Sequence, residues 1–211
     1  MIQGNNTERG FFVEDKIFEW LYGVIVRPAG ALNDIAREKP VWWGLLIYLG
    51  ISVLGSLAAL FDPEVVATYE EITRQFTFSI PITPLAIGGI LFSILLLLFY
   101  VGALHLFGRL FGGRGGYWNM FSAYAFASFP GIIGVPVTAL GGVLGGVGSV
   151  LTSMVGLGIS IWVIVLQVIA LRESHDLSTG MSILAYFITF FLLGVVPVIL
   201  VIGLAIAYIF I

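Results

Sequence analysis

The fold is decided by residues 115–171, which read GGYWNMFSAYAFASFPGIIGVPVTALGGVLGGVGSVLTSMVGLGISIWVIVLQVIAL and contain no charged side chain. At about 1.5 Å per residue, one straight helix of this length would run about 85 Å, whereas the hydrocarbon core of a bilayer is about 30 Å thick. The chain must therefore turn back once within this stretch. Glycine favours turns, and the sequence GGVLGGVG at residues 141–148 predicts where the turn lies.

Uncharged runs also occupy most of the remaining chain. The charged residues fall into four clusters, in 8–39, 62–74, 109–114 and 172–176. A membrane-spanning helix needs about 20 apolar residues, and backbone groups in lipid must be paired within the helix itself. The sequence therefore predicts an all-α bundle of five transmembrane helices, over residues 40–61, 84–111, 118–141, 148–171 and 181–208.

Composition supports a polytopic membrane protein. Hydrophobic residues make up 59% of the chain and charged residues 10%, against about 45–50% and about 25% in soluble domains. Mean hydropathy is +1.08. These values exclude a soluble enzyme, and a net charge of −3 leaves no basic surplus for a nucleic-acid partner. The absence of cysteine excludes disulfides and thiolate metal sites.

The distribution of basic residues predicts the orientation. With five spans, eight of the nine Lys and Arg share the side of the N-terminus, and Arg74 alone lies on the other side. Basic loop residues concentrate on the cytoplasmic side. We therefore expect a multi-pass protein of the cell membrane with a cytoplasmic N-terminus and the C-terminus outside. Trp42, Trp43 and Trp118 lie at predicted cytoplasmic helix ends, where an aromatic belt belongs.

Two shorter segments have amphipathic patterns. Over residues 13–27 one apolar stripe recurs at helical spacing, formed by Val13, Ile17, Leu21, Val24 and Ile25. This pattern predicts an amphipathic helix on the cytoplasmic membrane surface, ended by Pro28. A second helix is expected over residues 62–76, with Asp62 as N-cap and Pro63 as its first residue. We divide the chain into a cytoplasmic segment, 1–39, and a five-helix transmembrane domain, 40–211.

Polar groups inside the predicted spans are few. His105 lies one turn from Arg109; a bond to a neighbouring helix is the plainer interpretation, and a proton relay or ligand role the alternative. Gln167 is expected to bond between helices or to contact a substrate. Apart from Arg109 at the end of the span 84–111, no span carries Asp, Glu, Lys or Arg, and no protease motif is present, so we expect no catalytic site and no cofactor. His105, His175 and Asp176 lack the spacing of a metal site, and none is predicted.

The third predicted span is interrupted twice within a few residues. Pro130 with Gly131, and Gly134 with Pro136, remove helical hydrogen bonds. Such breaks create a cavity in some transporters. They are equally compatible with a kink whose freed carbonyls bond to neighbouring helices.

Several short motifs occur together in a characteristic order. They are Arg27-Pro28 followed by 29–39, GGRGG at 112–116, AYAFASFP at 123–130, and Trp162 followed by LRESHDLSTG at 171–180. Their order and spacing resemble the Yip (Ypt-interacting protein) domain family in its bacterial and archaeal form, over nearly the whole chain from about residue 20.

The resemblance implies five helices, a cytoplasmic N-terminus and a non-enzymatic role. Eukaryotic relatives bind prenylated Rab-type GTPases and membrane proteins and act in vesicle formation and membrane organisation; a small GTPase as partner rests on this analogy alone. The family-like positions on the cytoplasmic side are Gly112, Gly113, Arg114, Tyr124, Pro130, Arg172, His175 and Gly180. With His105, Arg109, Gln167 and Asp176 they form the candidate partner or ligand site.

Two functions remain open from the sequence. The first is a membrane organiser or adaptor, which binds a partner through its cytoplasmic face or assembles with itself or other membrane proteins through glycine-rich helix faces. The second is a channel or transporter for a small or lipid-like solute, with the broken third span as a wall. A packed bundle with an exposed glycine-faced groove would favour the first. A cavity lined by His105, Tyr124, Ser128 and Gln167 would favour the second.

Overall fold

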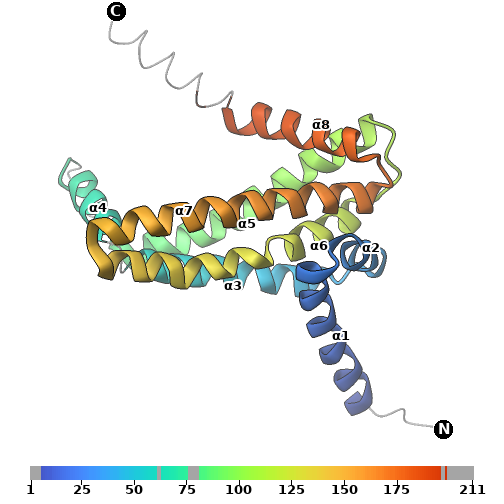
Figure 1. Cartoon of the computed structure of the whole chain (residues 1–211), viewed down its shortest axis with the longest axis horizontal. Coiled ribbons are helices and arrows are strands. Elements are labelled where there is room, and N and C mark those ends of the chain that lie inside the picture. The colour runs from blue at the N-terminus through green and yellow to red at the C-terminus, as the bar shows by residue number, and fades with distance from the viewer. Residues whose placement is uncertain (1–5, 61–62, 76–80, 196–197, 199–211) are drawn as a thin grey trace, which may run out of the picture.

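The computed structural model describes residues 6–60, 63–75, 81–195 and 198, and this part of the chain is helical and contains no strand. Its elements are α1 (Asn6–Val26), α2 (Pro28–Glu38), α3 (Val41–Ala59), α4 (Pro63–Gln75), α5 (Ile82–Leu110), α6 (Tyr117–Ala127), the 3₁₀ helix η1 (Phe129–Ile133), α7 (Gly134–His175), α8 (Thr179–Phe190) and the π-helical turn η2 (Phe191–Val195) (Figure 1).

Four segments are long and apolar enough to cross a membrane: Val41–Ala59, Thr83–Leu110, Tyr117–Val137 and Val150–His175. They agree with the first four predicted spans. A fifth apolar segment, Thr179–Val195, is shorter, and most of the remainder of the predicted span 181–208 lies outside the described residues. The all-helical membrane architecture is therefore confirmed, and the count of five spans stays a prediction.

α7 doubles back on itself, as Figure 1 shows. A Cβ atom added to Gly141 would lie 2.7 Å from the side chain of Thr152. Eleven residues of straight helix would separate these positions by about 16 Å along the axis. The reversal therefore lies where the glycine-rich stretch 141–148 predicted it.

The interruption of the third span is a kink. Helix α6 ends at Ala127, and η1 continues the chain through one 3₁₀ turn in which Pro130 is buried. Ser128 ties the kink to the last turn of α6, because its amide and its hydroxyl both donate to the Tyr124 carbonyl oxygen, at 3.1 and 3.0 Å, and its own carbonyl oxygen accepts from the Gly131 amide at 3.0 Å. Pro136 lies in the first turn of α7, where a missing N–H costs little.

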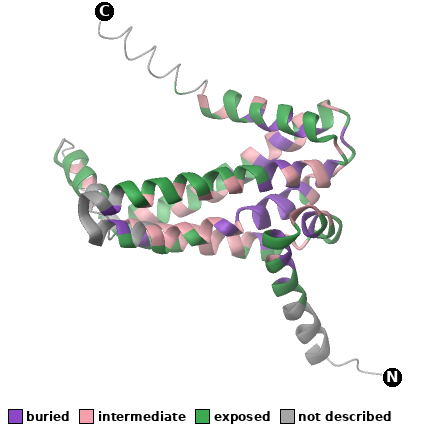
Figure 2. Ribbon diagram, in the orientation of Figure 1, coloured by how far each residue is buried: buried purple, intermediate pink, exposed green. Residues whose placement is uncertain are grey.

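Buried side chains gather at one end of the bundle, which we call the α2 end; it is formed by α2, residues 111–116 and the connection between α7 and α8 (Figure 2). The opposite end, with α4 and the turn of α7, is the α4 end (Figure 1). α6 forms the centre of the packing and contacts α2, α3, α5 and α7. Gly44 of α3 allows this approach, since a Cβ there would lie 3.1 Å from the Cβ of Ala125.

The N-terminal segment contains one helix more than the sequence predicted. Pro28 ends α1, as expected, but it is also the first residue of α2, where proline is favoured. The signal was a second apolar stripe, formed by Ala31, Leu32, Ile35 and Ala36, all of which are buried. Asp62, the predicted cap of α4, lies outside the described residues, whereas Pro63 is the first described residue of that helix.

α1 projects from the bundle at a steep angle to α3, α5 and α7 (Figure 1). Two residues of its predicted stripe, Ile17 and Val24, are buried in the protein core rather than free to face lipid. Among the α1 residues whose burial is described, the exposed apolar side chains are Phe18, Tyr22, Ile25 and Val26, and only Ile25 belongs to the predicted stripe. Contact between α1 and the membrane surface thus stays a prediction, with a largely different set of side chains available for it.

Candidate functional site

The glycine-rich connection between α5 and α6 folds over the C-terminal end of α7. The amide of Gly113 donates to the Gly108 carbonyl oxygen at 2.9 Å, and the amide of Arg114 donates to the His175 carbonyl oxygen at 3.0 Å. Gly112 adopts a φ of +90°, which L side chains rarely tolerate. The connection therefore caps one of the unpaired carbonyls at the end of α7.

Close contact with α7 requires glycine both near the end of α5 and in the connection that follows it. A Cβ on Gly108 would lie 2.9 Å from Cδ2 of His175, and a Cβ on Gly113 would lie 2.8 Å from Cβ of the same histidine. A Cβ on Gly115 would overlap the carbonyl oxygen of Ser174. These three glycines, of which only Gly113 was predicted to belong to the site, thus lie against the end of α7 that carries the fully buried His175 side chain.

His175 bonds to the other histidine of the chain. Nδ1 of His105 and Nε2 of His175 are 3.0 Å apart, and Nδ1 of His175 lies 2.9 Å from Oγ of Ser174. Ser174 also contacts Sδ of Met120 at 3.1 Å. This row of polar groups joins α5, α7 and α6. His105 therefore has a partner on a neighbouring helix, and that partner is a histidine ring rather than a carbonyl or hydroxyl group.

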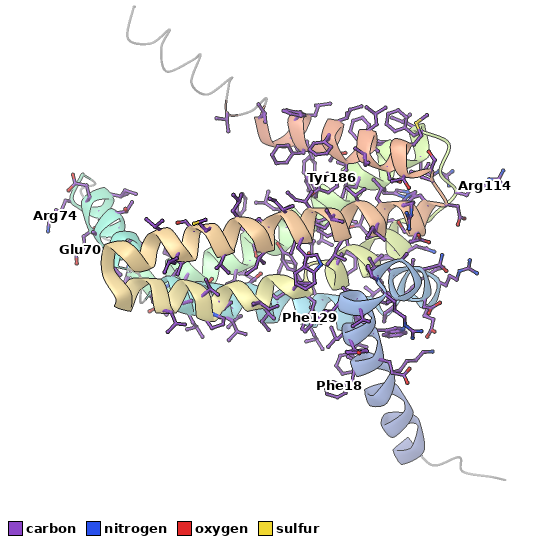
Figure 3. All side chains as sticks on the ribbon, in the orientation of Figure 1. Phe18, Glu70, Arg74, Arg114, Phe129 and Tyr186 are labelled. Atoms are coloured by element: carbon purple, nitrogen blue, oxygen red, sulfur yellow. The ribbon has the colours of Figure 1, made fainter. Side chains whose placement is uncertain are left out.

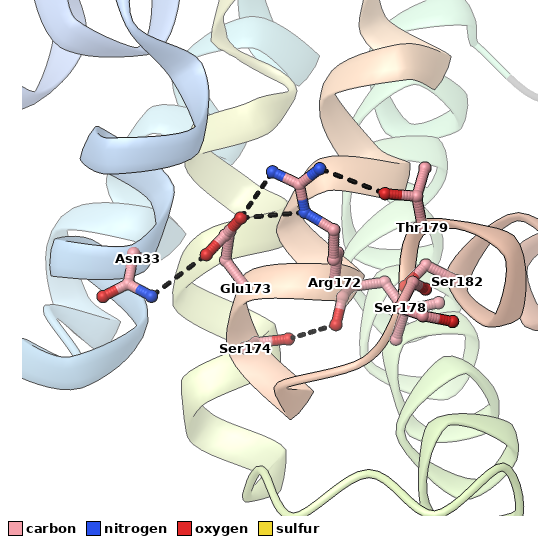
Figure 4. Close-up of polar contacts among 8 residues, drawn as sticks. Asn33, Arg172, Glu173, Ser174, Ser178, Thr179 and Ser182 are labelled. Carbon is pink, nitrogen blue, oxygen red and sulfur yellow. Dashed lines mark hydrogen bonds and ion pairs between the residues drawn. The ribbon is translucent and has the colours of Figure 1, made fainter.

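A second polar network joins α2, α7 and α8 at the same end (Figure 4). Nε and Nη2 of Arg172 donate to Oε1 of Glu173 at 2.8 and 2.6 Å, and Nη1 donates to Oγ1 of Thr179 at 3.3 Å. Nδ2 of Asn33 donates to the other carboxylate oxygen at 3.0 Å. Arg172 thus holds the start of α8 against the end of α7. Sequence reasoning missed Asn33 because it missed α2.

Three charged candidate residues are exposed around this end: Arg109, Arg114 and Asp176. Asp176 ends α7 in the left-handed conformation, with φ of 54°. The side chain of Arg114 points away from the bundle (Figure 3). None of the three forms an ion pair with another residue that the structure describes. Gly112 and Gly180 are also exposed. The surface of the α2 end therefore presents both charged side chains and glycine backbone.

Gln167 belongs to a different cluster, deeper in the bundle. The hydroxyl of Tyr186 donates to Oε1 of Gln167 at 2.6 Å, and Nε2 of Gln167 donates to Oγ of Ser128 at 3.3 Å. These bonds join α8, α7 and the end of α6, so the amide serves interhelical bonding. Tyr124 lines an apolar cleft of about 400 Å³ with Tyr48 and Tyr100. Neither His105 nor Gln167 lines that cleft.

A shallow groove lies between the start of α7 and its returning half. It has a volume of about 410 Å³, and its lining includes Gly131, Gly134, Gly156, Ile159 and Ser160. A Cβ added to any of these three glycines would meet nothing within 4 Å. The glycines therefore leave open space on the outer surface of the bundle.

Within the described ranges, no three His, Cys, Asp or Glu side chains come together as a possible metal site. The arrangement is suited to binding, through the exposed charged residues at the α2 end and through the open groove that is lined by glycines.

These features define a polytopic helical membrane protein in which His105, His175 and Gln167 bond to partners on neighbouring helices. A family model of the Yip1 domain matches residues 22–208. The chain therefore belongs to the Yip1 domain family, whose members are non-enzymatic membrane proteins, and the resemblance found in its motifs is confirmed. Searches among curated proteins and among solved structures found no match.

Proposed function

We propose that this Yip1-family protein is a non-enzymatic membrane organiser that assembles, with itself or with another membrane protein, through the groove at Gly131, Gly134 and Gly156. The groove is the observation that carries the proposal. Apolar side chains gain little by leaving lipid for a helix interface, so helices in membranes associate mainly where small residues let backbones approach closely. The groove is lined by such small residues, and the space beside them is unoccupied.

The α2 end is the second contact surface of the proposal. Arg109, Arg114 and Asp176 are exposed there and free of ion pairs with other described residues. The excess of Lys and Arg at this end supports a cytoplasmic location, with the N-terminus on the same side. A cytoplasmic partner, or the cytoplasmic part of a membrane partner, would then meet these charges.

The transporter alternative gains no support from the arrangement of polar groups. Gln167 is bonded to Ser128 and Tyr186, and His105 is bonded to His175 in a separate cluster. The cleft lined by Tyr124 does not include His105, Ser128 or Gln167, the other three residues of the expected pathway. The broken third span is explained by its local kink.

The groove is tested by one substitution at two positions of the same helix. Gly156→Leu fills the groove, whereas Gly158→Leu places the same side chain about 200° around α7, outside the groove residues. A photo-crosslinking amino acid at Ile159 should capture a membrane protein or a second copy in native membranes. We expect Gly156→Leu to abolish this adduct and Gly158→Leu to retain it.

A crosslinker at Leu157, which does not line the groove, is the position control. Equal adducts from Ile159 and Leu157, or equal loss in both leucine variants, would contradict assembly through the groove.

The cytoplasmic surface is tested by charge reversal at opposite ends of the molecule. Arg114→Glu should reduce recovery of partners extracted gently from membranes, whereas Arg74→Glu, at the α4 end (Figure 3), should not. Reporter fusions to the N-terminus should read as cytoplasmic. Unchanged recovery with Arg114→Glu, or an external N-terminus, would remove this surface from the proposal.

A further inference from the structure

A second groove opens at the α2 end between α3, α5 and α6. Its volume is about 480 Å³, and its lining includes Lys39, Trp42, Leu45, Ile94, Leu98 and Trp118. This volume falls within the range of about 300–1,000 Å³ typical of ligand sites. No glycine lines this groove, so helix backbones cannot approach closely here, in contrast to the groove at Gly156.

The lining of the groove includes one charged side chain, Lys39, which is not part of an ion pair among the described residues. Lys39 is exposed and ends α2 in the left-handed conformation, with φ of 54°. The adjacent carboxylate of Glu38 pairs instead with Nζ of Lys16 at 2.6 Å. Lys39 itself forms no ion pair with any residue that the structure describes. An unneutralised ammonium group therefore lies at the edge of an apolar groove.

The depth of the groove in the membrane follows from its helices. Trp42, 76% exposed, lies in the first turn of α3, and Trp118, 51% exposed, lies in the first turn of α6. Tryptophan at such positions marks the boundary between headgroups and hydrocarbon. Leu45 lies about one turn further into the span than Trp42. The groove thus has its charge at the headgroup level and an apolar wall that runs into the hydrocarbon core.

We propose that this groove binds one anionic phospholipid, with its phosphate on Nζ of Lys39 and the upper part of an acyl chain between Leu45 and Leu98. The occupant must be anionic where it meets Lys39 and apolar below it. It must also be narrower than a helix, which with its side chains is about 10 Å across. A lipid already present in the bilayer meets all three conditions.

The test measures lipid binding to the full-length protein by native mass spectrometry. Phosphatidylglycerol and phosphatidylcholine with identical acyl chains are titrated separately against the wild type, Lys39→Gln and Arg37→Gln. Arg37 is the matched control because it is an exposed cation in the same segment that does not line the groove.

We expect Lys39→Gln to weaken the first phosphatidylglycerol site about fivefold, which corresponds to roughly 1 kcal/mol for one basic residue near an anionic headgroup. Arg37→Gln should leave the site unchanged, and Lys39→Arg should retain it. Phosphatidylcholine binding should respond to none of the three. Equal affinity for both lipids in the wild type, or equal effects of Lys39→Gln and Arg37→Gln, would overturn the proposal.

The apolar half of the site is tested separately. Leu98→Trp narrows the groove and leaves Lys39 in place, and we expect it to weaken phosphatidylglycerol binding at least as much as Lys39→Gln does. Unaltered binding in Leu98→Trp would show that the headgroup alone is held and would overturn the role of the groove. Circular dichroism of each variant verifies that the helices remain folded.

Discussion

The α2 end is packed like the core of a soluble protein, whereas the α4 end leaves most of its apolar side chains facing outward (Figure 2). Along α5, Leu85, Ile87 and Leu91 are exposed toward the α4 end, whereas Val101 and Leu104 are fully buried toward the α2 end. Lipid solvates apolar side chains as well as a protein interior does, so burial of leucine adds little in a membrane. The difference indicates that contacts between polar side chains and between small residues on neighbouring helices, rather than leucine burial, specify this fold.

Both polar networks at the α2 end connect segments distant in the sequence. His105 and His175 are 70 residues apart, and Asn33 and Glu173 are 140 residues apart. By comparison, Arg74 at the α4 end pairs with Glu70, one turn away on the same helix, at 3.6 Å. We therefore expect substitutions at the α2 end to affect the whole molecule and those near the α4 end to remain local.

The largest effect should come from Gly115→Ala. The added methyl group overlaps the Ser174 carbonyl oxygen, and rigid backbone on both sides leaves no room to adjust. We expect a loss of about 3 kcal/mol in the free energy of unfolding, at the upper end of overpacking costs. Steric trapping in bicelles measures it.

Gly50→Ala is the matched control, because a Cβ there meets nothing within 4 Å and the position lies within α3. It should stabilise the protein by up to about 1 kcal/mol through helix propensity. A similar loss for both variants would contradict a steric origin of the Gly115→Ala effect.

A smaller effect is expected from Tyr186→Phe. The substitution removes the hydroxyl that donates to Gln167 and leaves the buried amide oxygen without this donor. Hydrogen bonds between membrane helices are worth about 0.6–1.7 kcal/mol, and we expect about 1 kcal/mol here. A double-mutant cycle with Gln167→Leu isolates the pair, and additive losses would show that the two side chains do not cooperate.

The smallest effect is expected from Lys16→Ala, which removes the ion pair with Glu38. Both side chains are nearly half exposed, at 46% and 41%, so water screens their attraction. We expect a change of about 0.5 kcal/mol or less. The melting temperature in mild detergent at low and high salt measures this change. A larger change would show that the contact between Lys16 and Glu38 belongs to the tightly packed region.

Much of the layout could be predicted because it depends on local physics. The length of the uncharged runs and the glycines at 141–148 predicted the spans and the reversal within α7. Pro63 predicted the start of α4. By contrast, α2 was missed because the helix is only eleven residues long and because four charged residues in 34–39 interrupt or follow its short apolar stripe. The partner of His105 was missed because periodicity within one segment carries no information about a neighbour.

By itself, the sequence determined that this chain lies in a membrane as helices, because uncharged apolar runs of this length are stable only in lipid with their backbone groups paired internally. It also determined the family, through motifs whose order is visible without coordinates. Only the tertiary structure decided that Gly108, Gly113 and Gly115 enclose the end of α7, and that Gly131, Gly134 and Gly156 form an open groove. The physical reason is that every glycine allows another backbone to come close, but only the position of the neighbouring helix decides whether the space beside it is already filled.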